Sequence, residues 1–308
     1  MLNTGKRGVQ AGALCALLVL GVPGAAQEPP TVFRSQLRLV VLHATVLDHA
    51  GQRVTDLPQS AFRVFENGVE QQVKIFRRED SPVSIGLVID DSGSMINKRQ
   101  KVAAAALSLV RASHPGDEVF ILHFNEKAYL DTDLTNDRAK LEKGLATFDS
   151  RGTTAMRDAL RLAIEHLARK GREDKKVLVV ITDGEDNSSV LERDAVVRSA
   201  QQSGILVYAV GLLTEIDDER TERAKREIDA LTQATGGQAY YLKDVSEADA
   251  TARDIAREIR DQYTFAYTPT DQQLDGTFRK IEVSTTGPRA LTVRTRSGYY
   301  AVSASQIP

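Results

Sequence analysis

Cysteine is almost absent from this chain of 308 residues, which contains only Cys15. That residue lies in the apolar stretch Val9 to Val22, within a leader that we expect to be cleaved. The mature chain would then carry no thiol, and so no disulfide, no zinc–thiolate site and no cysteine nucleophile. We therefore expect its stability to come from packing alone.

Motifs of several enzyme classes are missing as well. No Gly-x-Gly-x-x-Gly or Walker sequence occurs, so a glycine-rich phosphate loop is not indicated. No Gly-x-Ser-x-Gly occurs, so a serine hydrolase would lack its nucleophile elbow. The histidines share neither a short spacing nor a helical face and indicate no metal site; they are His43, His49, His114, His123 and His166.

The chain also lacks an excess of positive charge. It has 40 basic and 42 acidic residues, and loss of Lys6 and Arg7 with the leader would leave 38 basic residues and a formal charge of −4. A mildly acidic surface without a basic block argues against nucleic acid as a partner. The contents of hydrophobic residues, 42%, and of charged residues, 27%, are those of an ordinary soluble globular protein.

The first 26 residues have the layout of a secretory signal peptide. Lys6 and Arg7 precede the apolar stretch, and Gly24-Ala25-Ala26 supplies a small-residue cleavage site. The apolar stretch is too short to span a bilayer comfortably, so we expect no stable membrane insertion after cleavage. This layout predicts a secreted or periplasmic protein, with an uncleaved N-terminal anchor as the alternative. Leu14 before Cys15 disfavours a lipoprotein acceptor.

The central region alternates short apolar runs with helical periodicities. Strands separated by helices imply a largely parallel sheet that is covered on both faces. We expect strands at Val83 to Ile89, Val119 to Phe124, Val177 to Thr182, Ile205 to Val210 and Ala239 to Leu242, and an antiparallel edge strand at Ala128 to Leu130. We expect helices over Val102 to Val110, Met156 to Leu167, Arg193 to Ser203, Glu222 to Thr235 and Ala248 to Asp261.

The two flanks indicate β structure instead. Each has β-branched or alternating runs, and Asn67-Gly68 is a strong hairpin signal. Neither flank alone has enough strands for a stable sandwich, so we predict that they pair into one small β domain with the α/β domain inserted between them. Two separate strand clusters are the alternative. The runs are Leu37 to Leu47, Ala61 to Glu66, Val69 to Phe76, Gln262 to Tyr267, Phe278 to Thr285 and Leu291 to Arg296.

The predicted boundaries follow from these patterns. Residues 1–26 form the signal peptide, 27–80 an N-terminal β segment, 81–261 the α/β domain, and 262–308 a C-terminal β segment that pairs with 27–80.

Three side chains follow the first central strand on a turn: Asp90, Ser92 and Ser94. Ligands bind in open α/β sheets at such carboxyl ends of strands. Two further pieces add oxygen donors, with Thr153 after a glycine and Asp183 directly after another apolar strand. Hard cations such as Mg²⁺ prefer oxygen ligands, so the pattern indicates a site for one.

Simpler interpretations exist for each residue alone. Ser92 and Ser94 would serve as N-cap residues of the helix that we expect to begin near Ile96. Asp183 before a glycine is also typical of a turn. We interpret the neighbouring acids as solvated loop residues, with tuning of a cation as the alternative; they are Asp91, Glu185 and Asp186.

Together, these pieces resemble the metal-ion-dependent adhesion site (MIDAS) of the von Willebrand factor type A (VWA) domain, over roughly residues 81 to 261. The resemblance implies a Rossmann-like fold and a divalent cation, Mg²⁺ or alternatively Mn²⁺ or Ca²⁺. The site residues it implies are Asp90, Ser92, Ser94, Thr153 and Asp183. It further implies that a protein partner completes the coordination shell with an Asp or Glu carboxylate, without catalysis.

The flanks resemble the VWFA-related domain of acidobacterial secreted proteins. The matching pieces are Val54-Thr55-Asp56-Leu57, the segment Phe62 to Gly68, and Arg296-Ser297-Gly298-Tyr299-Tyr300. This second resemblance implies nothing about the ligand, because that subfamily is defined by sequence.

Two other functions remain as alternatives. An aspartate ending the first strand also describes haloacid-dehalogenase-type phosphatases, but their general acid two residues later is Ser92 in this chain. We therefore expect no enzymatic activity. A structural envelope protein with an idle metal site is the second alternative.

Overall fold

The computed structural model describes residues 39–78, 80–147, 150–183, 186–212, 218–287 and 290–303. The expected signal peptide, residues 1–26, lies outside these ranges. Within them, no helix is both long and apolar enough to cross a membrane.

A mostly parallel sheet forms the centre of the α/β domain. Within the described residues its strands lie in the order β10-β9-β8-β5-β6-β7, and only β7 is antiparallel to its neighbour. The expected antiparallel edge strand is therefore confirmed, although it is longer than predicted. The strands are β5 (Val83–Asp90), β6 (Glu118–Phe124), β7 (Ala128–Thr135), β8 (Lys175–Thr182), β9 (Leu206–Gly211) and β10 (Ala239–Tyr241).

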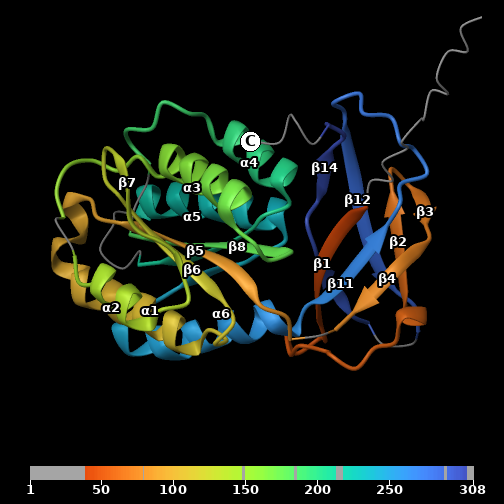
Figure 1. Ribbon diagram of the computed structural model, residues 1–308, viewed down its shortest axis with the longest axis horizontal. Helices are drawn as coiled ribbons and strands as arrows, with labels where there is room; N and C mark the ends of the chain where they lie inside the picture. Colours follow the sequence, from red (N-terminus) through yellow and green to blue (C-terminus); the bar gives the residue numbers. More distant parts are fainter. Residues whose placement is uncertain are drawn as a thin grey trace, which may run out of the picture. The chain divides into compact units, whose positions relative to one another are not determined.

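Helices cover both faces of this sheet, as expected for strands that are apolar on both sides. One apolar core joins the sheet to α1, α2 and α6, and a second joins it to α3, α4 and α5 (Figure 1). The elements are η2 (Gly93–Lys98), α1 (Arg99–Ala112), α2 (Arg138–Gly144), α3 (Met156–Lys170), α4 (Arg193–Ser203), α5 (Asp218–Thr235), η3 (Val245–Glu247) and α6 (Ala248–Asp261).

The flanks pair into a small β domain, as predicted. In the described part of the chain one sheet has the order β13-β1-β11-β4 and the other β14-β12-β2-β3, so each sheet contains strands from both flanks. The two sheets share an apolar core. The elements are β1 (Val40–Leu47), η1 (Gln59–Ala61), β2 (Phe62–Glu66), β3 (Val69–Gln71), β4 (Val73–Arg77), β11 (Tyr263–Tyr267), β12 (Phe278–Thr285), β13 (Thr292–Arg294) and β14 (Gly298–Tyr300).

A buried carboxylate joins two of the motifs that the sequence singled out. Glu66, at the end of β2, accepts hydrogen bonds from the hydroxyls of Tyr267, at 2.7 Å, and Tyr299, at 2.9 Å. Burial, followed by this carboxylate, raises the pKa of Tyr267 far above its ordinary value, so the phenol stays a donor. Gly298 precedes Tyr299, and a Cβ there would lie 2.3 Å from the Arg279 carbonyl oxygen, so the close strand approach requires glycine.

The closing strands also contact the α/β domain. Ser297 N–H donates to the carbonyl oxygen of Ala234 at the end of α5, at 3.2 Å. The Gln201 side chain in α4 donates to both of these residues, at 3.0 and 3.1 Å. Arg294 pairs with Glu258 of α6, whose carboxylate also accepts from Tyr208. These polar contacts connect the inserted α/β domain to the C-terminal segment of the β domain.

Candidate metal centre

Two adjacent strands position the carboxylates of the predicted site. β5 and β8 are parallel neighbours, and the paired residues run from Val83 with Lys175 to Ile89 with Ile181. Asp90 is the last residue of β5, and Asp183 follows the last residue of β8. Because the carboxyl ends of parallel strands meet at one edge of a sheet, the two acids converge although 93 residues separate them.

The serine hydroxyls form a chain that ends on Asp183. Ser92 Oγ lies 3.1 Å from Ser94 Oγ, and Ser94 Oγ donates to Asp183 Oδ1 at 2.8 Å. The residue before η2, Ser92, makes no side-chain cap hydrogen bond. The N-cap interpretation of Ser92 is therefore wrong, and the structure brings both hydroxyls to the second strand end instead.

Asp90 is completely buried and is held by two donors. Its Oδ1 accepts from the backbone N–H of Ser92 at 2.9 Å, and its Oδ2 accepts from Thr182 Oγ1 at 2.6 Å. Burial, helped by the nearby charge of Asp183, raises the pKa of Asp90 to about 6, although the hydrogen bonds from Thr182 and Ser92 act in the opposite direction. Asp90 is thus fixed in place, and a positive charge added nearby would favour its ionised form.

Thr153 lies in the loop that approaches the turn between β5 and η2. Gly93 N–H donates to the Gly152 carbonyl at 3.0 Å, and Thr154 N–H donates to Asn187 Oδ1 at 2.9 Å, so the residues on both sides of Thr153 are fixed. Gly152 has φ +74°, a conformation that favours glycine. Thr153 itself is exposed, and within the described residues its hydroxyl is hydrogen-bonded to none of the other four site side chains.

The donor set fits a hard divalent cation. Magnesium takes oxygen ligands at about 2.1 Å in octahedral geometry, which places neighbouring ligand oxygens about 3 Å apart. The successive oxygen separations from Ser92 to Ser94 to Asp183 are 3.1 and 2.8 Å. Among the described residues there is no cluster of three or more His, Cys, Asp or Glu side chains suited to a metal, so hydroxyls must supply part of any shell here.

Lys98 is the site residue that the sequence did not reveal. Its Nζ donates to Asp183 Oδ2 at 2.9 Å, and the two side chains are 4% and 1% exposed. A lysine near the start of a helix is normally solvated, so no sequence signal indicated its burial. The short helix η2 turns the ammonium inward, where it neutralises part of the charge of Asp183.

Asp91 was interpreted as a solvated loop acid, and this is wrong. The side chain is fully buried and accepts hydrogen bonds from Ser150 Oγ at 2.7 Å and from the Tyr129 hydroxyl at 2.8 Å. Arg99, at the start of α1, donates to the same Ser150 hydroxyl at 2.8 Å. Asp91 therefore fixes the turn after β5 against β7 and the loop before α3.

The same correction applies to Asp186, which is 8% exposed. Its Oδ2 accepts from the Arg157 backbone N–H at 2.7 Å and from Ser189 Oγ at 2.6 Å. The Arg157 and Ser189 hydrogen bonds lower the pKa of Asp186, although burial acts in the opposite direction. Asp186 thus ties the segment after Asp183 to the first turn of α3. Glu185, the third acid in that interpretation, lies outside the described residues.

Known sequences match the central part of this chain. The chain matches the von Willebrand factor type A domain over residues 84–258, more than half of its length. It is 32% identical over 166 residues to calcium-activated chloride channel regulator 1 of Mus musculus, which covers 51% of this chain and 17% of that protein. It is 26% identical over 186 residues to an uncharacterized protein of Synechocystis, covering 58% of this chain and 42% of that one. The chain therefore spans less than half the length of these relatives.

Solved structures resemble the fold at low sequence identity. A von Willebrand factor type A protein from Catenulispora acidiphila superposes with a TM-score of 0.53 at 13% identity, covering 88% of this chain and 75% of that one. Proximal thread matrix protein 1 from the mussel byssus, solved with a zinc-occupied MIDAS motif, gives a TM-score of 0.50 at 18% identity, covering 63% and 49%. At these identities the likeness concerns the fold alone.

Proposed function

Because the chain belongs to the von Willebrand factor type A domain family, we propose that it binds a divalent cation and, through that cation, a partner protein. The preferred ion is Mg²⁺, with Mn²⁺ or Ca²⁺ as alternatives, since all ligands are oxygens. The proposed site residues are Asp90, Ser92, Ser94, Thr153 and Asp183. The proposed partner presents an Asp or Glu carboxylate.

One observation supports this proposal above the others. Asp183 lies 89 residues after Ser94, yet the side-chain oxygens of Ser92, Ser94 and Asp183 are linked at 3.1 and 2.8 Å, and neither serine hydroxyl is used to cap η2. This arrangement leads from the turn after Asp90 to Asp183, the acid that follows β8. It supplies neighbouring oxygens at the separation that an octahedral ion requires.

The side chains around the centre would hold an ion and leave part of its positive charge available to a partner. A bound cation supplies an electrophilic point for a partner carboxylate. The two serine hydroxyls are neutral donors of oxygen, so they leave most of the charge of an ion uncompensated. Thr182 and the Ser92 N–H hold Asp90 through both carboxylate oxygens, and Lys98 neutralises part of Asp183. Both effects favour recognition of a further negative group.

This proposal includes no catalytic step. A phosphatase of the type considered above would need a proton donor two residues after Asp90, and that position is Ser92, whose hydroxyl is bonded to Ser94. We further propose secretion or export to the periplasm, which rests on the sequence of residues 1–26.

Isothermal titration calorimetry with Mg²⁺ and Mn²⁺ tests the metal site. The double variant Ser92→Ala/Ser94→Ala removes two hydroxyls without adding bulk, and we expect it to lose measurable binding while keeping the wild-type circular dichroism spectrum. The matched control is Ser60→Ala/Ser284→Ala in the β domain. Titration of the site variant at wild-type affinity would refute the assignment.

The partner is tested by capture from an envelope extract with the purified chain as bait. Proteins bound through a bridging cation are released by EDTA and are not captured by the Ser92→Ala/Ser94→Ala variant. Captured proteins that remain bound in EDTA and bind the variant equally would contradict cation-mediated recognition.

A further inference from the structure

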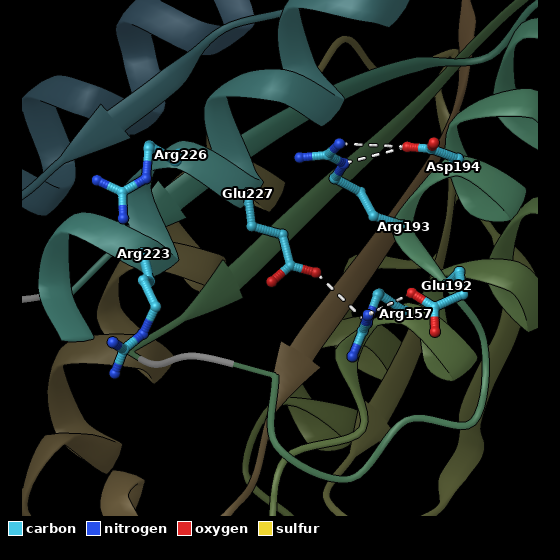
Figure 2. Close-up of a pocket in the computed structure, with 7 residues that line it drawn as sticks. All are labelled: Arg157, Glu192, Arg193, Asp194, Arg223, Arg226 and Glu227. Atoms are coloured by element: carbon cyan, nitrogen blue, oxygen red, sulfur yellow. Dashed lines mark hydrogen bonds and ion pairs between the residues drawn. The ribbon is translucent and has the colours of Figure 1, made fainter. Parts of the chain in front are cut away.

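A polar cavity lies between α5 and the segments that carry α3 and α4. It has a volume of about 490 Å³ and is lined by four arginines: Arg157, Arg193, Arg223 and Arg226. Figure 2 shows two of them, Arg223 and Arg226, on one helix and the other two on the facing segments. We call this cavity the arginine pocket. The chain as a whole has a net charge of −2, so this concentration of arginine is a local departure from its acidic average.

The four arginines differ in how many ion pairs they form with other residues of the chain. Arg157 is fully engaged, by Asp186 at 3.1 Å and by Glu227 at 3.4 Å. Arg193 is half exposed and, among the residues that the structure describes, pairs only with its chain neighbour Asp194, at 3.3 Å. The exposed Arg226 has no ion pair or hydrogen bond with any residue in the described ranges. Exposed ion pairs of the Arg193 type stabilise little, so that side chain is available to an incoming anion at low cost.

Acidic residues in the lining limit what the pocket accepts. Glu192 and Asp194, whose side chains are 91% and 85% exposed, face Arg157 and Arg193, and Glu227 is directed across the cavity to Arg157 (Figure 2). Three carboxylates among four guanidinium groups leave the lining a formal charge of +1, so it attracts a dense polyanion such as a sulfated glycan much less than four unopposed arginines would. A peptide whose carboxylates are spaced along its chain can pair with Arg193 and Arg226 while its charges stay away from the three lining carboxylates.

The pocket is coupled to the metal centre by short covalent paths. Arg157 lies four residues after Thr153, and Asp186 lies three residues after Asp183. Asp186 and Arg157 are joined by a backbone hydrogen bond at 2.7 Å and by their side chains. Three residues span at most about 11 Å. An extended peptide of a few residues can therefore reach from the centre to the pocket.

Two exposed apolar side chains are close in the sequence to the residues of the metal centre and of the arginine pocket. Ile96, two residues after Ser94, is 53% exposed, and Val190, two residues before Glu192, is 89% exposed. Large apolar residues near a group of arginines are typical of protein-binding surfaces.

We propose that the arginine pocket receives a second acidic side chain of the partner whose first carboxylate the metal centre binds. This inference rests on the proposed function and makes it more specific. The partner segment is a peptide with several acidic residues within a few positions of one another, and a lone Asp or Glu in a neutral surface is a weak ligand.

Fluorescence anisotropy with labelled hexaglutamate, a single-glutamate peptide of equal length and a sulfated heparin hexasaccharide tests this. In EDTA, wild-type protein binds hexaglutamate, and Arg193→Glu/Arg226→Glu weakens binding by about tenfold or more. The matched control, Arg253→Glu/Arg257→Glu, makes the same charge change on exposed residues of α6 and leaves binding unchanged. Equal losses in both variants would reveal nonspecific attraction and overturn the proposal, as would tighter binding of the heparin fragment than of hexaglutamate.

Magnesium separates the two proposals. We expect Mg²⁺ to strengthen hexaglutamate binding, and we expect Ser92→Ala/Ser94→Ala to remove this increment while leaving the binding in EDTA intact. If the increment is present but the pocket variant binds like wild type, the pocket is not a subsite and the proposed function stands. If the pocket variant loses binding in EDTA but Mg²⁺ has no effect on wild type, the proposed function fails, and with it the claim that one partner bridges both sites.

Discussion

Replacing Lys98 by methionine tests how the metal centre is balanced in charge. The Lys98 ammonium and the Asp183 carboxylate form an ion pair at 2.9 Å, with side chains 4% and 1% exposed. Methionine has nearly the same length and no charge, so the variant leaves Asp183 buried without its counter-ion. A divalent cation at the same centre would then meet no competing positive charge.

The structure fixes the expected magnitude. Removal of one partner from a buried ion pair costs about 3–5 kcal/mol, most of which is the penalty of the unpaired charge. For a domain of this size, each kcal/mol corresponds to roughly 2 °C in melting temperature, so Lys98→Met should melt about 6–10 °C below wild type in EDTA. Saturating Mg²⁺ should restore several degrees, because a ligand at a hundred times its Kd stabilises by about 2.7 kcal/mol.

Thermal melts followed by circular dichroism, in EDTA and in Mg²⁺, give the result. The matched control is Lys225→Met, which breaks an exposed pair with Glu222 whose side chains are 36% and 58% exposed. That change should alter stability by less than about 1 kcal/mol. Melting of Lys98→Met at the wild-type temperature in EDTA, or a rise in Mg²⁺ no larger than that of wild type, would refute this reasoning.

Three further predictions concern the centre and its scaffold. Asp90, with its pKa raised to about 6, stabilises the metal-free fold fully below its ordinary value near 3.8 and loses this contribution as the pH rises through about 6. Because a bound ion requires the ionised carboxylate, the Mg²⁺-induced rise in melting temperature should become smaller as the pH falls from about 7 to about 5. A rise that stays constant over this range would contradict the prediction. Gly86→Ala places a Cβ 2.4 Å from the ring of Phe120 and should lower the free energy of unfolding, measured in urea, by about 1–3 kcal/mol. An unchanged urea midpoint would mean that the strands move apart without cost. Tyr299→Phe removes a hydrogen bond to the buried Glu66 and should cost about 1.5–3 kcal/mol by the same assay; no loss would mean that the bond is replaced.

The carboxyl ends of the central strands could be predicted because local and tertiary signals coincide there. The strands that lead to Asp90 and Asp183 contain the uninterrupted apolar runs 85–89 and 177–181, which are typical of strands covered on both faces. Parallel neighbours then place both acids at one edge without any knowledge of packing. The contribution of Thr153 is less direct, because its position depends on the loop hydrogen bonds at Gly152 and Thr154.

Burial of charged residues could not be predicted. Lys98 and Asp91 occupy a short helix and a turn, where the same residues are usually solvated. Both are buried because other segments close over them: Asp183 after β8 receives Lys98, and Ser150 with Tyr129 receives Asp91. These partners are between 38 and 85 residues away in the sequence, so no local sequence pattern predicts the contacts.

The flanks show a similar limit. The run Val69 to Phe76 was predicted as one strand, but it forms β3 and β4, which pair with β2 and β11 in different sheets. The short helix α2 was not predicted, since it has seven residues and is mostly polar. Its N-terminus is fixed by Asp137, whose side chain accepts from the N–H groups of Ala139 and Lys140. Pairing of the two flanks was predictable because neither could bury its apolar faces alone.

The most direct test of the central claim is a calorimetric titration of the purified chain with Mg²⁺, repeated with Asp183→Asn. This variant keeps the shape of the residue that accepts from both Ser94 and Lys98 while removing its charge. We predict one saturable site in wild type and none in the variant. Absence of binding in the wild type, or equal binding in the two proteins, would contradict the assignment of Asp90, Ser92, Ser94, Thr153 and Asp183 as a metal centre.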